Sequence, residues 1–343
     1  HVTHGMDVVV TGASGFVGSA VTRCLIKRTD VKRVKILVRP SSNVKEFEKE
    51  PKCEIIRSSF DDANSLKQAC TGANIIIHCA AMVTDWGKWE EFYQTNVVGT
   101  TNIVSAALNA WKSGSLQRYT HISTTDVYGY PHTAKDIDES KPVKSTDLPY
   151  NKTKVMAEEL VWKASTEGLP VTIIRPANVF GPGSKDFVVE VGEAIRDGVM
   201  PYIHGGHTSA GMIYIDNLAE GIIQATLSPK TVHQAYNMVD TEDVSWKEYC
   251  EQLAAGLGYR KPWLSLPFWL VWWLAILMEF IYTLFGIKSR PLLTRHAVLL
   301  FMYPQDYCNS KAIRDFGFTS NVPFNEAMKR TVDWAKTQPQ FKK

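Results

Sequence analysis

Short apolar runs alternate with longer amphipathic segments along the first half of the chain. Residues 8–10 are three consecutive valines, as in a strand buried on both faces, and residues 16–26 carry apolar side chains at helical spacing. Further strand-like runs lie within residues 34–39, 53–60, 74–83, 118–125 and 169–180. Strands that alternate with helices in this way form parallel sheets. The pattern therefore predicts an α/β fold, a doubly wound parallel sheet with helices on both faces.

The second half of the chain has a different pattern. We expect a main domain at residues 6–183 and a smaller, mostly helical substrate-binding lobe at 184–343, from which some segments return to the main sheet. Within this lobe, residues 262–287 are apolar almost throughout and hold four of the ten tryptophans. Glu279 interrupts this run after 268–278, and a membrane-spanning helix needs about 20 consecutive apolar residues.

Two interpretations of the tryptophan-rich segment stay open. Tryptophan is enriched at membrane interfaces, which favours contact with a membrane surface. The alternative is a lid that packs on the core and lines an apolar mouth. Both interpretations predict a lipophilic substrate. The first residues, HVTHGM, contain no apolar leader. We therefore expect a protein on the cytoplasmic side, associated with a membrane, which in a eukaryote would be the endoplasmic reticulum.

Composition and charge narrow the classes of function. Of the 343 residues, 45% are hydrophobic and 21% charged, which is typical of a globular protein. The net charge is only +3 and no long basic run is present, so nucleic acid is not an expected partner. The six cysteines are scattered without a C-x-x-C pair. The sequence therefore predicts neither a disulfide framework nor a metal site.

The strongest local signal is the glycine-rich stretch TGASGFVG after the first predicted strand. Gly12, Gly15 and Gly18 recur every three residues, and Phe16 and Val17 begin the helical segment that follows. A strand, a glycine-rich turn and a helix N-terminus together form a cradle for a pyrophosphate, because the backbone N–H groups can approach the anion closely. We predict that these five residues bind a dinucleotide.

This stretch resembles the TGxxGxxG fingerprint of the extended short-chain dehydrogenases/reductases, which implies a Rossmann-type fold. In such folds the residue that reads the ribose lies at the end of the second strand. Here that residue is Arg39, followed by Ser41 and Ser42. A cation and hydroxyl donors suit a ribose 2′-phosphate. We predict NADP(H) as the preferred cofactor, with NAD(H) possible; the alternative is a solvated arginine at a strand end.

The resemblance implies further cofactor contacts along the next two strands. The family's third strand usually ends in Gly-Asp, whose carboxylate contacts the adenine amine. Ser59 stands at that position here and Phe60 follows it, so this contact departs from the family pattern. The stretch HCAA resembles the family's H-x-A-A motif, in which Ala80 and Ala81 let the ribose lie against the backbone.

Two further polar residues in this part of the chain have structural interpretations. His78 lies inside the end of a strand, and we interpret it as a packed core histidine rather than a catalytic one. Asn96 matches the family's N-V-x-G-T, where the asparagine holds the active-site strand and can join a proton relay. We expect only the structural role here.

The candidate catalytic group combines a hydroxyl residue with a tyrosine and a lysine. Tyr150 and Lys154 are four residues apart after Pro149, so on a helix they share one face. The stretch STTDVYG resembles the family's S-S-x-x-V-Y-G, which places the catalytic hydroxyl at Thr124, with Thr125 as a rival only if the register slips. We expect Tyr150 to transfer the proton and Thr124 to bind the substrate oxygen. Lys154, together with the positive nicotinamide ring of the oxidised cofactor, should lower the pKa of the phenol, and Lys154 should also bond the nicotinamide ribose.

The stretch RPANVFGPG resembles the family segment that passes the nicotinamide amide. Pro176, Asn178 and Val179 are therefore further candidate cofactor residues, and Asn178 is also a candidate substrate residue. Phe187 and Tyr202 are candidate walls of the substrate site.

Two smaller features complete the predictions for the C-terminal lobe. His204 and His207 flank two glycines, and we expect them to form a mobile loop rather than a metal site, because no third ligand is apparent. The segment 214–216 resembles a structural strand-to-helix junction of the family.

The C-terminal region resembles that of the 3β-hydroxysteroid and sterol dehydrogenases, with SRPLLTRHAV, a helix beginning near Ser310 and a final helix. The resemblance implies an oxidoreductase that interconverts a secondary alcohol and a ketone on a steroid, sterol or other isoprenoid. Dihydroflavonol-type carbonyl reductases and sugar-nucleotide epimerases or dehydratases remain alternatives, as does a redox-sensing protein without activity. Homodimers are common in the family and are possible here.

Overall fold

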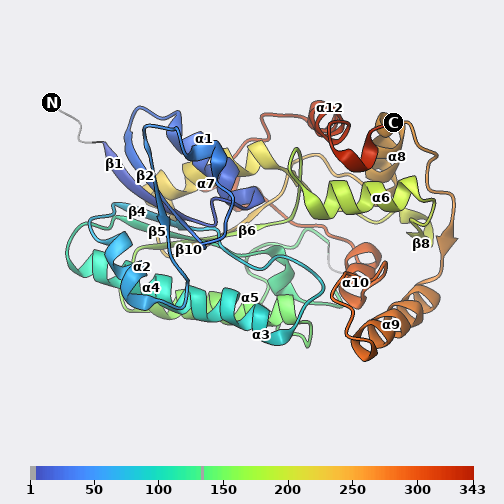
Figure 1. The fold of residues 1–343 in the computed structure, drawn as a ribbon, viewed down its shortest axis with the longest axis horizontal. Coiled ribbons are helices and arrows are strands. Elements are labelled where there is room, and N and C mark those ends of the chain that lie inside the picture. Colours follow the sequence, from blue (N-terminus) through green and yellow to red (C-terminus); the bar gives the residue numbers. More distant parts are fainter. Residues whose placement is uncertain (1–4, 133–134) are drawn as a thin grey trace.

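The computed structural model describes residues 5–132 and 135–343, and a seven-stranded parallel sheet forms its centre (Figure 1). The strand order is β10-β6-β5-β4-β1-β2-β3. The strands are β1 Met6–Thr11, β2 Val31–Val38, β3 Cys53–Arg57, β4 Ile75–His78, β5 Arg118–Ile122, β6 Val171–Pro176 and β10 Gln234–Met238. The chain runs outward from β1 in both directions, so the expected doubly wound α/β sheet is confirmed.

Helices cover both faces of the sheet, and each face has its own hydrophobic core (Figure 1). One face is covered by α1 Phe16–Ile26 and α7 Ile215–Leu227. The other is covered by α2 Ala63–Cys70, α4 Gly99–Lys112 and α5 Pro149–Thr166. The central strands are buried on both sides, which explains their continuous apolar sequence.

Local signals explain where several helices begin. Asp62 caps α2 by accepting a hydrogen bond from the Ser65 N–H at 3.1 Å. Pro149 occupies the first turn of α5, where its missing N–H costs nothing. Between α2 and α5 lie the short helix α3 Trp89–Phe92 and a π-helical turn, Tyr93–Val98, that leads into α4.

The register of the parallel strands brings the predicted motifs to one edge of the sheet. Thr11 pairs with His78, and His78 pairs with His121, so the residues that follow β1, β4 and β5 lie beside one another. Ligands of doubly wound sheets bind at this carboxyl edge.

The remaining elements form the C-terminal part of the chain. Its helices are α6 Val191–Arg196, α8 Trp246–Leu257, α9 Phe268–Leu284, α10 Arg295–Met302, α11 Ser310–Phe316 and α12 Phe324–Ala335. Two short parallel pairs join β7 Asn178–Phe180 to β9 Met212–Tyr214, and β8 Tyr202–Ile203 to β11 Ser265–Leu266. The strand-to-helix junction at 214–216 and the helix beginning at Ser310 are confirmed.

The tryptophan-rich segment forms α9, which packs on α10 with one face only (Figure 1). Val271 and Ala275 are fully buried, in a small cluster with Ile203 and Val298. The opposite face is open: Trp269 and Trp273 are each 64% exposed. Among the described residues we find no helix that is both long enough and apolar enough to cross a bilayer.

Candidate active site

The glycine turn after β1 is closed so tightly that side chains are excluded from it. Gly12 has φ +72°, and a Cβ there would lie 2.7 Å from the backbone nitrogen of Ala80. A Cβ on Gly18 would lie 2.0 Å from the carbonyl oxygen of Gly12. The N-cap Gly15 provides no side-chain acceptor for the first N–H groups of α1, where Phe16 and Val17 lie. Bare backbone donors at a helix N-terminus suit a dinucleotide pyrophosphate.

Two arginines lie at the loop after β2. Arg39 is exposed, and its Nη2 donates to the Thr95 hydroxyl at 2.9 Å. Arg57, the last residue of β3, donates through Nη1 to the carbonyl oxygens of Pro40 at 3.1 Å and Ser42 at 2.8 Å. The sequence analysis missed Arg57. Its position follows from register, because Arg57 pairs with the last residue of β2, Val38.

The residues after β3 offer a carboxylate close to the position where the family's aspartate is missing. The hydroxyl of Ser59 hydrogen-bonds the carboxylate of Asp61. The carbonyl oxygen of Phe60 accepts from Asn102 Nδ2 at 2.8 Å, which fixes this turn on α4. After β4, the N–H of Ala80 donates to the Thr11 hydroxyl at 3.0 Å, and Ala81 follows in the same loop.

His78 and Asn96 have their polar atoms engaged inside the protein. His78 is 2% exposed, and its Nδ1 lies 2.7 Å from Thr11 Oγ1, so it is a packed core histidine. Burial lowers its pKa to about 3. Asn96 accepts from the Met82 N–H at 2.8 Å and donates to the Thr153 hydroxyl at 3.1 Å. Asn96 thus ties the loop after β4 to α5.

Thr124, Tyr150 and Lys154 come together at the carboxyl ends of β5 and β4. Thr124 directly follows the end of β5, and its hydroxyl interacts with the phenol of Tyr150. Lys154 is 4% exposed and donates to the carbonyl oxygen of Ile122 at 2.8 Å. The helix α5 therefore directs both side chains toward the end of β5 and the turn after it that carries Thr124.

Burial and charged neighbours set the pKa of the Tyr150 phenol in the chain alone. Burial raises the pKa of Tyr150, and the Asp126 carboxylate raises it further, whereas the hydrogen bond with Thr124 lowers it. Burial also lowers the pKa of Lys154 to about 8, although Glu158 opposes this shift. In the chain alone, burial and a neighbouring carboxylate therefore dominate the pKa of the Tyr150 phenol.

A buried ion pair joins α5 to β6. Glu158 and Arg175 are paired, and their side chains are 2% and 5% exposed. Glu158 also accepts from the Ser123 hydroxyl at 2.7 Å, and Arg175 donates to the Tyr128 hydroxyl at 3.1 Å. The pair therefore joins the helix that carries Tyr150 to both β6 and the residue before Thr124. Sequence reasoning did not identify either partner.

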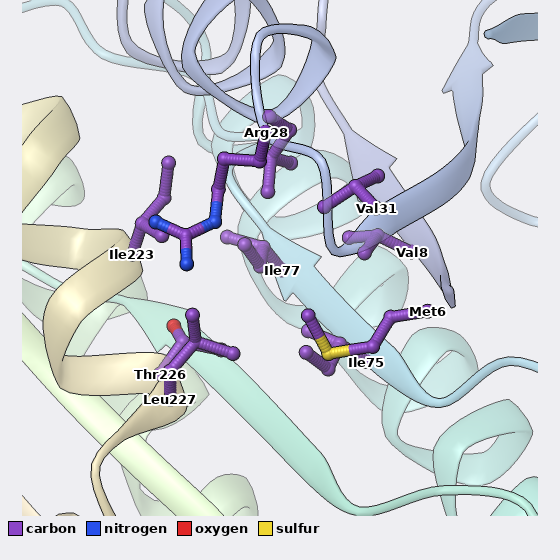
Figure 2. A pocket seen from close by; sticks show the side chains of 10 residues that line it. Met6, Val8, Arg28, Val31, Ile75, Ile77, Ile223, Thr226 and Leu227 are labelled. Atoms are coloured by element: carbon purple, nitrogen blue, oxygen red, sulfur yellow. The ribbon is translucent and has the colours of Figure 1, made fainter. Parts of the chain in front are cut away.

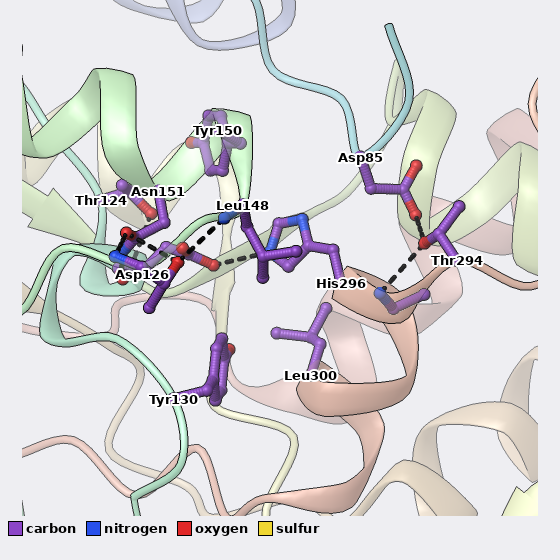
Figure 3. A network of polar contacts seen from close by, with 12 residues as sticks. Asp85, Thr124, Asp126, Tyr130, Leu148, Tyr150, Asn151, Thr294, His296 and Leu300 are labelled. Atoms are coloured by element: carbon purple, nitrogen blue, oxygen red, sulfur yellow. Dashed lines mark hydrogen bonds and ion pairs between the residues drawn. The ribbon is translucent and has the colours of Figure 1, made fainter. Parts of the chain in front are cut away.

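The C-terminal part of the chain supplies polar groups beside Tyr150 (Figure 3). His296 on α10 contacts the carboxylate of Asp126 at 2.7 Å, and its ring centroid lies 5.8 Å from that of Tyr150. Arg290 donates to both oxygens of Asp85 at 2.6 Å. The residues in these pairs are 170 and 205 positions apart, so no local sequence pattern predicts the contacts.

Two acidic residues lie near the same cluster, on the π-helical turn Lys185–Glu190. Burial raises the pKa of Asp186 to about 6 and that of Glu190 to about 7. The Asp186 carboxylate also raises the pKa of Tyr150. The surroundings of Tyr150 are therefore rich in acidic groups.

The other predicted residues have mainly structural contacts. Pro176 is buried at the end of β6, and Val179 is half-buried in β7. Asn178 Nδ2 donates to the carbonyl oxygen of Ala210 at 2.8 Å. Phe187 stacks on Trp246 with centroids 5.9 Å apart.

Tyr202 and the histidine loop belong to the contacts around α9. Tyr202 is 6% exposed, and the Lys247 ammonium lies over its ring. Its hydroxyl has no hydrogen-bond partner in the part of the chain that the structure describes. His204 accepts from the Phe268 N–H at 3.3 Å, so it joins its loop to the start of α9. Throughout 5–132 and 135–343, no group of three His, Cys, Asp or Glu side chains could hold a metal ion.

The pocket in Figure 2 lies away from this cluster. Its lining is mostly aliphatic and comes from β1, β2, β4, α1 and α7, with Arg28 from the loop after α1. Met6 and Ile75, the first residues of β1 and β4, belong to it, so it lies at the opposite end of the strands from Gly12. It is a packing gap between helices and sheet, remote from the candidate chemistry.

Comparisons with known proteins agree with this arrangement. A sequence model of the NAD dependent epimerase/dehydratase family matches residues 8–238. The chain is 28% identical to the 2-alkyl-3-oxoalkanoate reductase of Stenotrophomonas maltophilia, over 95% of this chain and 98% of that protein. It is also 28% identical to the 3beta-hydroxysteroid-dehydrogenase/decarboxylase isoform 1 of Arabidopsis thaliana, over 95% of this chain and 78% of that protein.

Solved structures share the fold over nearly the whole chain. The crystal structure of gox2253 superposes with a TM-score of 0.80 at 25% identity, covering 98% of this chain and 100% of the other. The UDP-glucuronic acid 4-epimerase from Bacillus cereus, in complex with UDP-glucuronic acid and NAD, has a TM-score of 0.75 at 20% identity, covering 96% of this chain and 99% of the other. The second similarity concerns the fold alone.

Proposed function

Because the chain belongs to the NAD dependent epimerase/dehydratase family, within the extended short-chain dehydrogenases/reductases, we propose that it interconverts a secondary alcohol and a ketone on a lipophilic steroid, sterol or isoprenoid. It is an NAD(P)-dependent enzyme of the short-chain dehydrogenase/reductase type. The observation that carries the proposal is the meeting of Thr124, Tyr150 and Lys154 beside the glycine turn. The names of the two relatives, a reductase and a hydroxysteroid dehydrogenase, support net oxidation or reduction.

The side chains of the cluster suit proton transfer to a carbonyl oxygen. When bound, the dinucleotide supplies or accepts the hydride. Thr124 donates a hydrogen bond to the substrate oxygen and stabilises the charge that develops there. Tyr150 delivers the proton, and the raised pKa of its phenol keeps it protonated at neutral pH, as a general acid in ketone reduction requires. Lys154, held by the Ile122 carbonyl oxygen, orients the nicotinamide ribose.

NADP(H) is the cofactor that the loop after β2 favours. Arg39 and Arg57 bring two guanidinium groups to a loop that also carries Ser41 and Ser42. Guanidinium groups pair well with a phosphate. Nothing acidic ends β2, where a carboxylate would repel a ribose 2′-phosphate. NAD(H) is the cofactor named with the epimerase family and with its solved structures, and it is the alternative.

The substrate class follows from the open face of α9. Trp269, Trp273, Phe280 and Leu284 point outward along this helix, each with 62–65% of its surface exposed. So large an apolar face on one helix marks a site of interaction with something apolar. A sugar-nucleotide enzyme needs polar or basic groups for a diphosphate, and this face offers none.

The partner that we assign to this face is a lipid bilayer surface. Exposed Arg260 and Lys261 precede the helix, and exposed Lys288 follows it. Tryptophans inserted at the acyl boundary with basic residues at the headgroups are the pattern of a helix that lies in a membrane interface. A lipophilic substrate would then reach the enzyme from the membrane in which it dissolves.

A turnover assay tests the proposed function. The purified protein is offered a 3β-hydroxysteroid, a farnesol-like alcohol, a dihydroflavonol and a nucleotide sugar, each with NADP(H) and NAD(H). We expect turnover of the steroid or the isoprenoid with NADP(H), and loss of that activity in Tyr150→Phe. The Arg57→Ala variant should lose its preference for NADP(H) while it keeps its activity with NAD(H). Turnover of the nucleotide sugar alone would contradict the proposal.

A further inference from the structure

His296 reaches the triad from a part of the chain that the dinucleotide motifs do not include. It is the second residue of α10, and its Nε2 contacts Asp126 Oδ2 at 2.7 Å (Figure 3). Both side chains are almost buried, with 12% and 7% exposed. The imidazole lies beside the Tyr150 ring, with 5.8 Å between centroids and 31° between the ring planes.

Asp126 is a buried carboxylate beside the candidate catalytic hydroxyl. Its backbone N–H donates to the Thr124 hydroxyl at 3.1 Å, so it lies next to the candidate catalytic oxygen. Among the described residues its buried Oδ1 has no hydrogen-bond partner, and its Oδ2 is paired with His296. A buried carboxylate without compensation would oppose the formation of a phenolate nearby.

A second ion pair holds α10 in this place. The Thr294 hydroxyl caps α10 by accepting from the Ala297 N–H at 3.1 Å, and it also donates to Asp85. Arg290 completes the contact with Asp85 at 2.6 Å. Asp85 lies in the loop after β4, at the same edge of the sheet as the triad. The position of His296 is therefore fixed by contacts between the C-terminal segment and the sheet.

We propose that His296 is a positioning residue for Tyr150: it neutralises Asp126, which would otherwise hold the phenol in its protonated form, and it makes the reactivity of the triad depend on the docking of α10. This inference rests on the proposed function and deepens it. As a positioning residue, His296 contacts neither the reacting atoms nor the cofactor. It acts through Asp126 on the phenol.

The titration of the surrounding groups agrees with this geometry. Burial lowers the pKa of His296, but Asp126 more than offsets that effect, so its pKa is raised above the ordinary value. The other charged groups facing His296 are Asp85, which raises its pKa, and Arg290, which lowers it, and Asp186 is coupled to it. With a raised pKa, the imidazolium is present below that pKa and is lost as the pH rises through it.

The test compares kcat/KM for alcohol oxidation across pH in four proteins: wild type, His296→Gln, Asp126→Asn and the double variant. In oxidation the phenolate accepts the proton, so activity rises with pH through the pKa of Tyr150. We expect His296→Gln to lower kcat/KM about tenfold, the equivalent of one pKa unit, at pH values below the pKa of His296, and to converge with the wild type as the pH rises through that pKa. The double variant should regain most of that loss, because the unpaired carboxylate is gone. His207→Gln is the matched control.

A merely structural role would give a different result. His296→Gln would then lower kcat/KM by the same factor at every pH, and adding Asp126→Asn would not restore activity. Either outcome would overturn the proposal.

A second readout needs no substrate. In an NMR titration of the histidine side chains, the signal that disappears in His296→Gln should titrate above the ordinary imidazole pKa, and Asp126→Asn should lower that pKa. Titration at or below the ordinary value would overturn the pairing. Absence of turnover with every substrate of the panel would instead contradict the proposed function alone.

Discussion

The glycine turn has no room for side chains, whereas helix α9 exposes large ones to the surroundings. At the turn, backbone atoms pack directly against one another, and a single added methyl group at Gly18 would overlap the carbonyl oxygen of Gly12. On α9, indole and phenyl rings extend outward, with Trp269 64% exposed. The sequence of the turn is thus constrained from inside the protein, whereas the sequence of α9 is constrained by what lies outside it. The two regions together suggest an enzyme with a rigid nucleotide site and an external apolar contact.

The largest effect on stability is expected at the buried ion pair between Glu158 on α5 and Arg175 on β6. Glu158→Gln leaves Arg175 buried without its counter-ion, and breaking a buried pair costs about 3–5 kcal/mol. Urea denaturation of the two proteins measures this loss. Glu326→Gln, which removes the exposed partner of Arg330, is the matched control and should change stability by about 0–1 kcal/mol. Equal effects of the two substitutions would contradict the supporting role of the buried pair.

A smaller loss is expected at the glycine turn. Gly18→Ala places a Cβ 2.0 Å from the Gly12 carbonyl oxygen, and overpacking of this kind costs about 1–3 kcal/mol. The movement of Gly12 should also weaken dinucleotide binding, which titration calorimetry measures. Gly15→Ala, whose Cβ would lie 3.3 Å from the same oxygen at a negative φ, is the milder control. If Gly18→Ala bound the dinucleotide as tightly as the wild type, the turn would not be the pyrophosphate site.

Substitutions on the open face of α9 should change stability least, but they should greatly weaken binding to lipid vesicles. Trp269→Gln combined with Trp273→Gln removes exposed side chains, so the free energy of unfolding should stay within about 0.5 kcal/mol per substitution. Sedimentation with vesicles of phosphatidylcholine and phosphatidylserine should decrease at least severalfold. Replacement of Val271, which is buried in the same helix, by Ala should instead cost stability and leave vesicle binding in place.

Two outcomes would argue against the membrane assignment. Unchanged sedimentation of the double variant would show that other residues bind the vesicles. Self-association of the wild type in solution, abolished by the same substitutions, would identify a second copy of the chain as the partner of this face.

Features that depend on neighbours along the chain could be predicted from the sequence. The glycine turn, the Asp62 cap and the Tyr150–Lys154 pair on α5 are all local, because strand, turn and helix geometry fixes which residues meet. The parallel direction of the strands also followed from the alternation of strands and helices along the chain.

Features that depend on tertiary placement could not be predicted in this way. The contact between His296 and Asp126 joins residues 170 positions apart, and nothing in either segment specifies the other. Arg57 reaches its loop only through the register of β2 and β3. Composition marked α9 as apolar, but the direction of its open face depends on which side packs on α10. The acidic and apolar surroundings that raise the pKa of the Tyr150 phenol also come from tertiary placement, while the effect expected from Lys154 and an oxidised cofactor stays a prediction.

The most direct test of the central claim follows deuterium from the cofactor in a single experiment. The protein is incubated with NADPH deuterated at the transferable position and with the ketone form of the steroid or isoprenoid that the panel identifies. We predict one deuterium at the carbinol carbon of the product for each NADPH consumed, and none with Tyr150→Phe. Interconversion of a nucleotide sugar with a tightly held cofactor and no net consumption of it would contradict the claim and identify an epimerase.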